Sequence, residues 1–423
     1  MKRIKVRRIL LSFLLILLAV LLLFTLGTWI DHRVKTGREL ALLKAKGYCN
    51  PVSVGEYSLN VTRFGNELGK HTIVGLAGLG MDDYMVTARR MTSQLEPDNE
   101  VVFVDRAGYG LSDDTEREMT LETIVEDYRL ALKNAGVEPP FVLMAHSFGG
   151  VYASWWVSKY PDEIEAVVFL DGTQLSETAY EDTPDSPVTF GDRAQALLAK
   201  LGFSRYVLRR ECYLYPDLFT GEEQALGDAL GLMTMESIAP VSESGLTRRN
   251  ARAAFAGIVA NDVPKLYVCA SWGAETPDDL LERNEYVNRQ IEKNRLGRPS
   301  LPTEYDDATA EAILERMDEL RRTVIQPYAD KMGSCRIVLL PGEHMIYLQK
   351  PDACGTLIRD FLDELPARRS RPLLRLFHGD DEAAFVIRFG RVSGGITLDV
   401  DAEFPILRAV VQPAPVSGGI KVL

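Results

Sequence analysis

Six short apolar runs alternate with longer amphipathic stretches through the middle of the chain. The runs are residues 71–80, 100–108, 140–147, 165–172, 264–271 and 335–344. Most of them have continuous apolar centres, which is typical of strands in a parallel sheet that helices cover on both faces. Between two of the runs, Thr120 is a predicted N-cap and Gly136 a predicted helix stop. We therefore predict an α/β fold with a doubly wound, mostly parallel sheet and a site outside the carboxyl ends of its strands.

Two intervals between the predicted strands are longer than a crossover helix requires. Residues 172–262 contain several helical stretches, and we interpret them as a helical cap inserted over the site. Residues 276–334 form a second long, charged and helical interval. The alternative for both intervals is a set of packing helices away from any site.

The N-terminus has the pattern of a membrane anchor. The first eight residues, MKRIKVRR, carry five basic side chains, and residues 9–30 carry no charge. As a helix this apolar span is roughly 33 Å long, which matches the hydrocarbon core of a bilayer. A cleaved secretory signal is the alternative, but its apolar region is normally about 7–15 residues long and ends at small residues. We expect a single-pass protein of the cell membrane, with the basic head in the cytoplasm and the rest of the chain outside it.

These patterns divide the chain into four predicted parts. They are a basic head and transmembrane signal anchor (1–32), a polar neck (33–54), the α/β domain with its cap (55–365) and a C-terminal extension (366–423). The extension alternates like short β-strands and has no catalytic motif.

Charge and cysteine usage exclude some classes of partner. The formal net charge of −12 argues against nucleic-acid binding, because phosphate backbones are held by clustered Lys and Arg.

The five cysteines, Cys49, Cys212, Cys269, Cys335 and Cys354, show no C-x-x-C spacing, so we expect no metal. Cys269 and Cys335 lie in apolar runs, where a free cysteine behaves as a small hydrophobic residue. A disulfide would suit an exported domain, but the sequence does not indicate a pairing.

The stretch FVLMAHSFGG, residues 141–150, places a serine between a predicted strand and a predicted helix. A nucleophile on such a sharp turn has a strained backbone and needs small residues two positions before and after it. Ala145 and Gly149 meet this condition around Ser147, so the motif is G-x-S-x-G with alanine at the first glycine. Ser147 is therefore the candidate nucleophile. The alternative is a buried serine before a packing glycine.

Five motifs occur together in one order: GLAGLG, VDRAGYGLSD, MAHSFGG, VVFLDGT and LPGEHMIYLQKPD. The chain thereby resembles the α/β-hydrolase superfamily, specifically its capped esterase and aminopeptidase-like branch, over roughly residues 55–365. The resemblance implies a sheet of the α/β-hydrolase type with an inserted helical cap. It also implies that His146 packs away from Ser147. The motif at 105–113 is expected to be scaffold without chemistry.

A catalytic serine requires a base, a carboxylate that orients the base, and donors for the oxyanion. His344 is the candidate base, because it alone among the five histidines follows a late apolar run in a turn before a predicted helix. An exposed turn histidine is the alternative.

The orienting carboxylate is less well determined. We favour Asp171, at a strand end that some members of the superfamily use. Many members place this acid after the strand that corresponds to residues 265–270, where the chain reads SWGAETPDD without the usual G-x-x-D, so Glu275 and Asp278 are alternatives.

The oxyanion donors are expected to be backbone N–H groups. Phe148 supplies one because it directly follows the nucleophile. The resemblance assigns the second to Leu79, although this chain has Ala77 where members of the superfamily often have histidine.

The sequence thus predicts a membrane-anchored serine hydrolase that cleaves a small to medium ester or amide without metal or cofactor. One alternative is a proline-iminopeptidase-like aminopeptidase, which needs a cap carboxylate for the substrate amine, such as one in 180–185 or Glu222–Glu223. Another is a catalytically silent hydrolase-fold binding protein at the cell envelope. The oligomeric state stays open.

Overall fold

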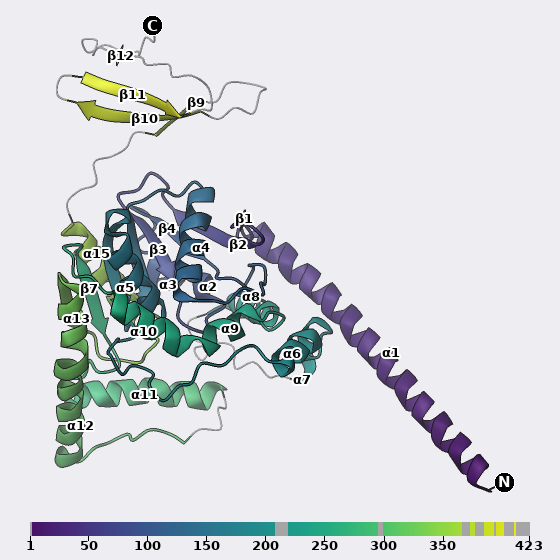
Figure 1. Cartoon of the computed structure of the whole chain (residues 1–423). Coiled ribbons are helices and arrows are strands. Elements are labelled where there is room, and N and C mark those ends of the chain that lie inside the picture. Colours follow the sequence, from purple (N-terminus) through teal and green to yellow (C-terminus); the bar gives the residue numbers. More distant parts are fainter. Residues whose placement is uncertain are drawn as a thin grey trace. The chain divides into compact units, whose positions relative to one another are not determined.

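The chain divides into two compact units, Met1–Glu364 and Leu365–Leu423 (Figure 1). The computed structural model describes residues 2–207, 219–294 and 299–365, together with four strands of the second unit. These strands are β9 (Leu373–Leu376), β10 (Phe385–Val392), β11 (Gly395–Asp401) and β12 (Val410–Val411). They form an antiparallel sheet in the order β12-β11-β10-β9. The rest of the predicted extension and Cys212 lie outside the described residues.

An eight-stranded sheet forms the centre of the first unit, in the order β1-β2-β4-β3-β5-β6-β7-β8. Its strands are β1 (Pro51–Ser53), β2 (Ser58–Gly65), β3 (Thr72–Leu76), β4 (Glu100–Val104), β5 (Phe141–His146), β6 (Ile164–Leu170), β7 (Lys265–Cys269) and β8 (Cys335–Leu339). The last six are parallel, and each coincides with one of the six apolar runs, with β6 beginning one residue before its run. The antiparallel strands β1 and β2 extend one edge. The predicted doubly wound, mostly parallel sheet is confirmed.

Helices cover both faces of this sheet (Figure 1). On one face, α4 (Leu121–Asn134) and α5 (Gly149–Lys159) pack on the strands, and Thr120 caps α4 by accepting a hydrogen bond from the Thr123 N–H. On the other face, Tyr84 of α2 (Tyr84–Thr87) contacts Phe103 and Tyr347. The strands β3, β4, β5 and β7 are buried along their whole length, which explains their continuous apolar sequences.

The interval between β6 and β7 contains five described helices. They are α6 (Phe190–Lys200), α7 (Ser204–Val207), α8 (Gly221–Thr234), α9 (Ala239–Gly245) and α10 (Thr247–Gly257). Of these, α10 packs against α5, so this part of the predicted cap belongs to a helical layer of the sheet. The later interval forms α11 (Pro277–Asn294), α12 (Asp307–Leu320) and α13 (Gln326–Met332), and α13 packs against β8 (Figure 1).

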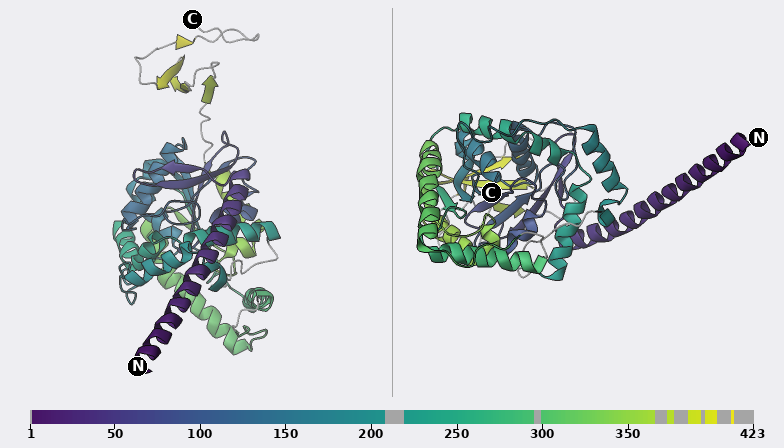
Figure 2. Two further views of the ribbon diagram at one scale, coloured as in Figure 1. Left: turned by 90° about the vertical axis from the view of Figure 1, so that its right-hand side faces the viewer. Right: turned by 90° about the horizontal axis from the view of Figure 1, so that it is seen from below.

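The first helix, α1 (Lys2–Ala45), contains the apolar N-terminal span. Its part from Leu10 to Ala45 is long and apolar enough to cross a membrane. In both views of Figure 2 its N-terminal half extends away from the rest of the unit. The helix also runs through residues 33–45, the first part of the segment predicted as a neck.

The first turn of α5 lies directly against the end of β3. A Cβ atom on Gly149 would lie 2.2 Å from the Leu76 carbonyl oxygen and 2.9 Å from its carbonyl carbon. Both obstructing atoms belong to the backbone of a buried central strand and have little freedom to move. This position therefore requires glycine for a steric reason.

We expect Gly149→Ala to lower the free energy of unfolding by about 1–3 kcal/mol, because an added methyl group overpacks the contact with β3. Gly221→Ala is the matched control, since a Cβ there meets nothing within 4 Å at the start of α8. Urea unfolding of the full chain in detergent measures both variants. Equal stability of the two would show that β3 and α5 separate at little cost.

Candidate active site

Ser147 lies on the sharp turn between β5 and α5. Its φ angle is 52°, in the left-handed region, which costs a non-glycine residue about 1–3 kcal/mol and persists only when the surroundings impose it. Its carbonyl oxygen accepts hydrogen bonds from the N–H groups of Gly150 and Thr173, both at 2.9 Å. The side chain is thereby held at the carboxyl end of the parallel strands.

His344 contacts both Ser147 and Asp171. Its Nε2 lies 2.8 Å from the Ser147 Oγ, and its Nδ1 lies 2.7 Å from the Asp171 Oδ2. The carboxylate is buried, with 4 % of its side chain exposed, whereas 47 % of the His344 side chain is exposed. The three groups therefore form one hydrogen-bonded line from a buried carboxylate to a partly exposed hydroxyl.

Asp171 follows β6 and has a φ angle of 45°, so it too lies in a left-handed turn. Its Oδ1 accepts from the backbone N–H groups of Ala270 (2.8 Å) and Ser271 (3.1 Å), and its Oδ2 accepts from the Ser271 hydroxyl. Burial raises the pKa of this carboxyl, but the hydrogen bonds from His344, Ser271 and Ala270 outweigh burial and hold the pKa below its usual value. Asp171 is therefore ionised at neutral pH.

The alternative acids lie elsewhere. Glu275 and Asp278 are exposed near the start of α11, where the Glu275 N–H donates to Asp279. Among the described residues, no hydrogen bond or ion pair joins either carboxylate to His344. The end of β7 thus contributes backbone donors to Asp171.

Leu79 and Phe148 carry the candidate oxyanion donors. Gly78 precedes Leu79 and lies so close to the nucleophile that a Cβ on it would be 2.9 Å from the Ser147 Cβ. Phe148 directly follows the nucleophile and is buried. In the described part of the chain, neither N–H donates a hydrogen bond to another protein group, so both are available to an oxygen of a substrate.

Arg106 holds the loop that carries Leu79. Its two terminal nitrogens donate to the carbonyl oxygens of Ala77 and Gly78, each at 2.8 Å. Its Nε lies 2.9 Å from the Glu243 Oε1, and both side chains are almost fully buried. The motif at 105–113 was expected to be scaffold without chemistry, and its arginine links this loop to α9.

The neighbour of the nucleophile, His146, packs into the interior as expected. It is buried, and its Nε2 donates to the His344 carbonyl oxygen at 3.0 Å. Burial and the adjacent His344 lower its pKa from 6.5 to about 3. His146 is therefore a neutral support for the His344 loop.

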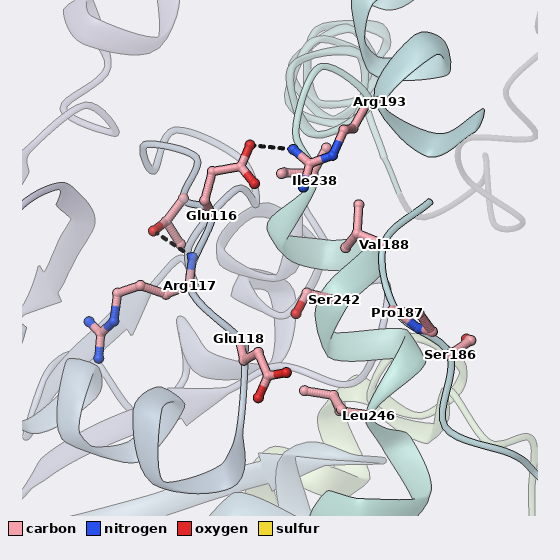
Figure 3. Close-up of a pocket in the computed structure, with 11 residues that line it drawn as sticks. Glu116, Arg117, Glu118, Ser186, Pro187, Val188, Arg193, Ile238, Ser242 and Leu246 are labelled. Carbon is pink, nitrogen blue, oxygen red and sulfur yellow. Dashed lines mark hydrogen bonds and ion pairs between the residues drawn. The ribbon is translucent and has the colours of Figure 1, made fainter. Parts of the chain in front are cut away.

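A cavity of about 170 Å³ lies where the interval after β6 meets the loop at 115–118 (Figure 3). Figure 3 shows Glu116 and Arg193, which form an ion pair from opposite sides of this junction. None of the candidate catalytic residues lines the cavity. Within the described ranges, no group of three or more His, Cys, Asp or Glu residues could hold a metal ion.

The cap carboxylates considered for an aminopeptidase have other roles. Glu222 forms an ion pair with Lys46, and Glu223 closes a capping box with Thr220 at the start of α8. The acidic side chains within 180–185 are exposed. None of these observations favours a binding site for a substrate amine.

Comparisons with known proteins agree with this architecture. Residues 73–216 match the family described as the alpha/beta hydrolase fold. The chain is 32% identical over 354 residues to the uncharacterized protein YbdG of Bacillus subtilis (strain 168), covering 82% of this chain and 94% of that protein. A shorter match, 28% identical over 86 residues, is to the cis-3-alkyl-4-alkyloxetan-2-one decarboxylase of Shewanella oneidensis, covering 20% of this chain and 27% of that one.

Among solved structures, the enol-lactonase from Burkholderia xenovorans LB400 is 17% identical with a TM-score of 0.46, covering 74% of this chain and 100% of that one. A putative ancestral haloalkane dehalogenase is 15% identical with a TM-score of 0.46, covering 75% and 100%. On the family match and the relative in Bacillus subtilis, the chain belongs to the α/β hydrolase fold family. The predicted resemblance to the α/β-hydrolase superfamily is thereby confirmed.

The low pKa of His146 has a consequence for stability at acid pH. Between pH 6.5 and about 3 the unfolded chain binds a proton at His146 and the folded chain does not. The contribution of His146 to stability is therefore fully present above pH 6.5 and is lost as the pH falls toward about 3. Relative to His146→Gln, which does not titrate, the wild type should lose up to about 1.4 kcal/mol of unfolding free energy per pH unit below 6.5. Urea unfolding between pH 7.5 and 4 measures the difference. If the difference in unfolding free energy between the wild type and His146→Gln did not change with pH, His146 would not be a buried neutral side chain.

Removing one partner of the Arg106–Glu243 pair should be strongly destabilising. We expect Arg106→Met to lower the free energy of unfolding by about 3–5 kcal/mol, because it leaves a buried charge without its ion pair. The double variant Arg106→Met with Glu243→Met should recover part of this loss, since no charge is then buried. Urea unfolding of Arg106→Met, Glu243→Met and the double variant tests the coupling. Additive effects of the two single substitutions would contradict it.

Proposed function

We propose that the chain is a serine hydrolase that cleaves a carboxylic ester or amide through an acyl-enzyme. Membership of the α/β hydrolase fold family supports a hydrolase. The observation that carries the finer proposal is the line of hydrogen bonds from the Ser147 Oγ through His344 to Asp171, at 2.8 and 2.7 Å. This order of hydroxyl, imidazole and carboxylate is what activates a serine nucleophile.

In the proposed acylation, the Ser147 Oγ attacks the acyl carbonyl carbon while its proton moves to the His344 Nε2. Asp171 holds the imidazole by its Nδ1–H and stabilises the imidazolium that forms. The tetrahedral intermediate then breaks its bond to the leaving alcohol or amine, which takes the proton from His344. The acyl group stays as an ester on Ser147.

Water completes the proposed cycle by the same route. His344 accepts a proton from the water as its oxygen attacks the acyl carbon, and then returns that proton to the Ser147 Oγ. In both steps the N–H groups of Leu79 and Phe148 stabilise the negative oxygen, since neither has an acceptor among the described residues. The contacts of Arg106 with the carbonyl groups before Leu79 fix this loop in advance.

We also propose that α1 anchors the enzyme in the cell membrane as a single-pass signal anchor. The apolar side chains from Leu10 to Ile30 are largely exposed to the surroundings, as expected for side chains that face lipid. The basic head then lies in the cytoplasm and the Ser147 site on the extracytoplasmic side.

A fluorophosphonate probe tests the nucleophile in the full chain, because its phosphorus is attacked by an activated serine with loss of fluoride. We expect labelling of the wild type, none of Ser147→Ala, and a rate reduced by about 10⁴ or more in His344→Ala. Labelling that survives Ser147→Ala would overturn the assignment. A folded wild type that stays unlabelled would favour the catalytically silent binding protein.

The same assay compares the candidate acids. Asp171→Asn should lower the labelling rate by about 10⁴, because the imidazole loses the partner that fixes its tautomer. Glu275→Gln is the matched control and should label at the wild-type rate. The opposite pattern would move the role of the acid to Glu275.

A further inference from the structure

Helix α6 has its large apolar side chains on the outside. Phe190, Leu197 and Leu198 are 86%, 57% and 48% exposed, whereas the small residues Ala196 and Ala199 are buried against the protein. This arrangement is opposite to the usual amphipathic helix, in which the large apolar residues face the core. The exposed parts of these side chains therefore do not contribute to the folding of this unit in water.

The exposed residues Phe190, Leu197 and Leu198 belong to one apolar stripe, whose other members Ala194 and Leu201 are half-buried. Positions 190, 194, 197, 198 and 201 are spaced so that they share a helix face, and all five are apolar. Arg193 and Lys200 lie along one border of the stripe. An apolar face bordered by basic residues is typical of helices that lie in a membrane interface.

The segment after α6 packs on the C-terminal end of the apolar span of α1. A Cβ on Gly202 would lie 2.6 Å from the His32 Cβ and 2.6 Å from the Thr28 carbonyl oxygen, so the two segments are in close contact. The rings of Phe24 and Phe203 meet edge to face, with 6.0 Å between their centroids. The chain directly after α6 is thus in contact with the span.

Polar contacts hold α7 and α8 on α1 just beyond this point. Arg205 donates to Glu39, with 2.5 Å between Nη2 and Oε2, and to His32 at 2.8 Å. His32 is buried and lies 2.9 Å from the Glu236 carboxylate. The Tyr206 hydroxyl donates to Asp31. These contacts fix the position of α6 and α7 relative to the axis of α1.

The depth of these contacts along α1 agrees with a membrane interface. Phe24 precedes Ile30, the last residue of the uncharged run, by six residues, which is about 9 Å along a helix. Interfacial helices bury their apolar faces by about 5–10 Å. If α1 crosses the bilayer, Phe203 lies at this depth.

We propose that the apolar face of α6, formed by Phe190, Leu197 and Leu198, together with Tyr206 of α7, lies in the phospholipid bilayer that α1 crosses. The cap thereby has a second membrane contact beside the anchor. The inference rests on the proposed anchoring by α1 and does not require Ser147 to be catalytic. It predicts that Lys200 lies among the lipid headgroups at the border of the apolar face, whereas Arg193 stays paired with Glu116.

A fluorophore that reports contact with lipid tests this surface. Cys49, Cys212 and Cys335 are first replaced by serine in the full chain, which leaves the buried Cys269 and Cys354. The variant Leu198→Cys is then labelled with NBD and reconstituted in nanodiscs of phosphatidylcholine and phosphatidylglycerol. We expect phosphatidylcholine with a doxyl group on its acyl chain to quench this label by about twofold or more, since an interfacial helix places its apolar face at the acyl boundary.

Two further positions serve as controls. Leu22→Cys lies in the middle of the span and should be quenched, whereas Leu68→Cys, at 73% exposure on the loop after β2, should not. Quenching at Leu22 without quenching at Leu198 would overturn the inference and leave the anchoring intact. Absence of quenching at both would overturn the anchoring as well, while fluorophosphonate labelling would still report on Ser147 independently.

Discussion

The contact between the first turn of α5 and the end of β3 determines where the candidate site can form. Because Gly149 lies against the Leu76 carbonyl group, the chain must turn sharply after β5, and Ser147 takes the left-handed conformation. The backbone of Ser147 then pairs with the end of β6, donating to the Leu170 carbonyl and accepting from the Thr173 N–H. Asp171 lies between these two partners, so the same turn that presents the serine also positions the carboxylate.

Much of this arrangement could be predicted because its signals are local. Continuous apolar runs predicted the parallel strands, and the position of Ser147 and His344 directly after such runs indicated the edge of the sheet where they meet. The choice between Asp171 and Glu275 could not be made in this way. The choice depends on which carboxylate lies within hydrogen-bond distance of the His344 imidazole, which is a matter of tertiary structure. At the end of β7, the backbone N–H groups of Ala270 and Ser271 donate to Asp171.

The role of Arg106 is invisible in the sequence for a different reason. An arginine in a glycine-rich turn is expected to be exposed, and its burial here depends on Glu243, which comes from a helix in the interval after β6. Likewise, the sequence of α6 shows an apolar stripe but not the direction in which it faces. Only the packing of Ala196 and Ala199 on the protein turns that stripe outward.

These contacts give the interval after β6 a structural function. Asp114 accepts hydrogen bonds from the N–H groups of Ile238 and Ala239 at the start of α9, and Ser242 accepts one from the Met119 N–H. Glu243 is therefore fixed while it pairs with Arg106. Displacing α9 would expose a buried charge and release the loop that carries Leu79.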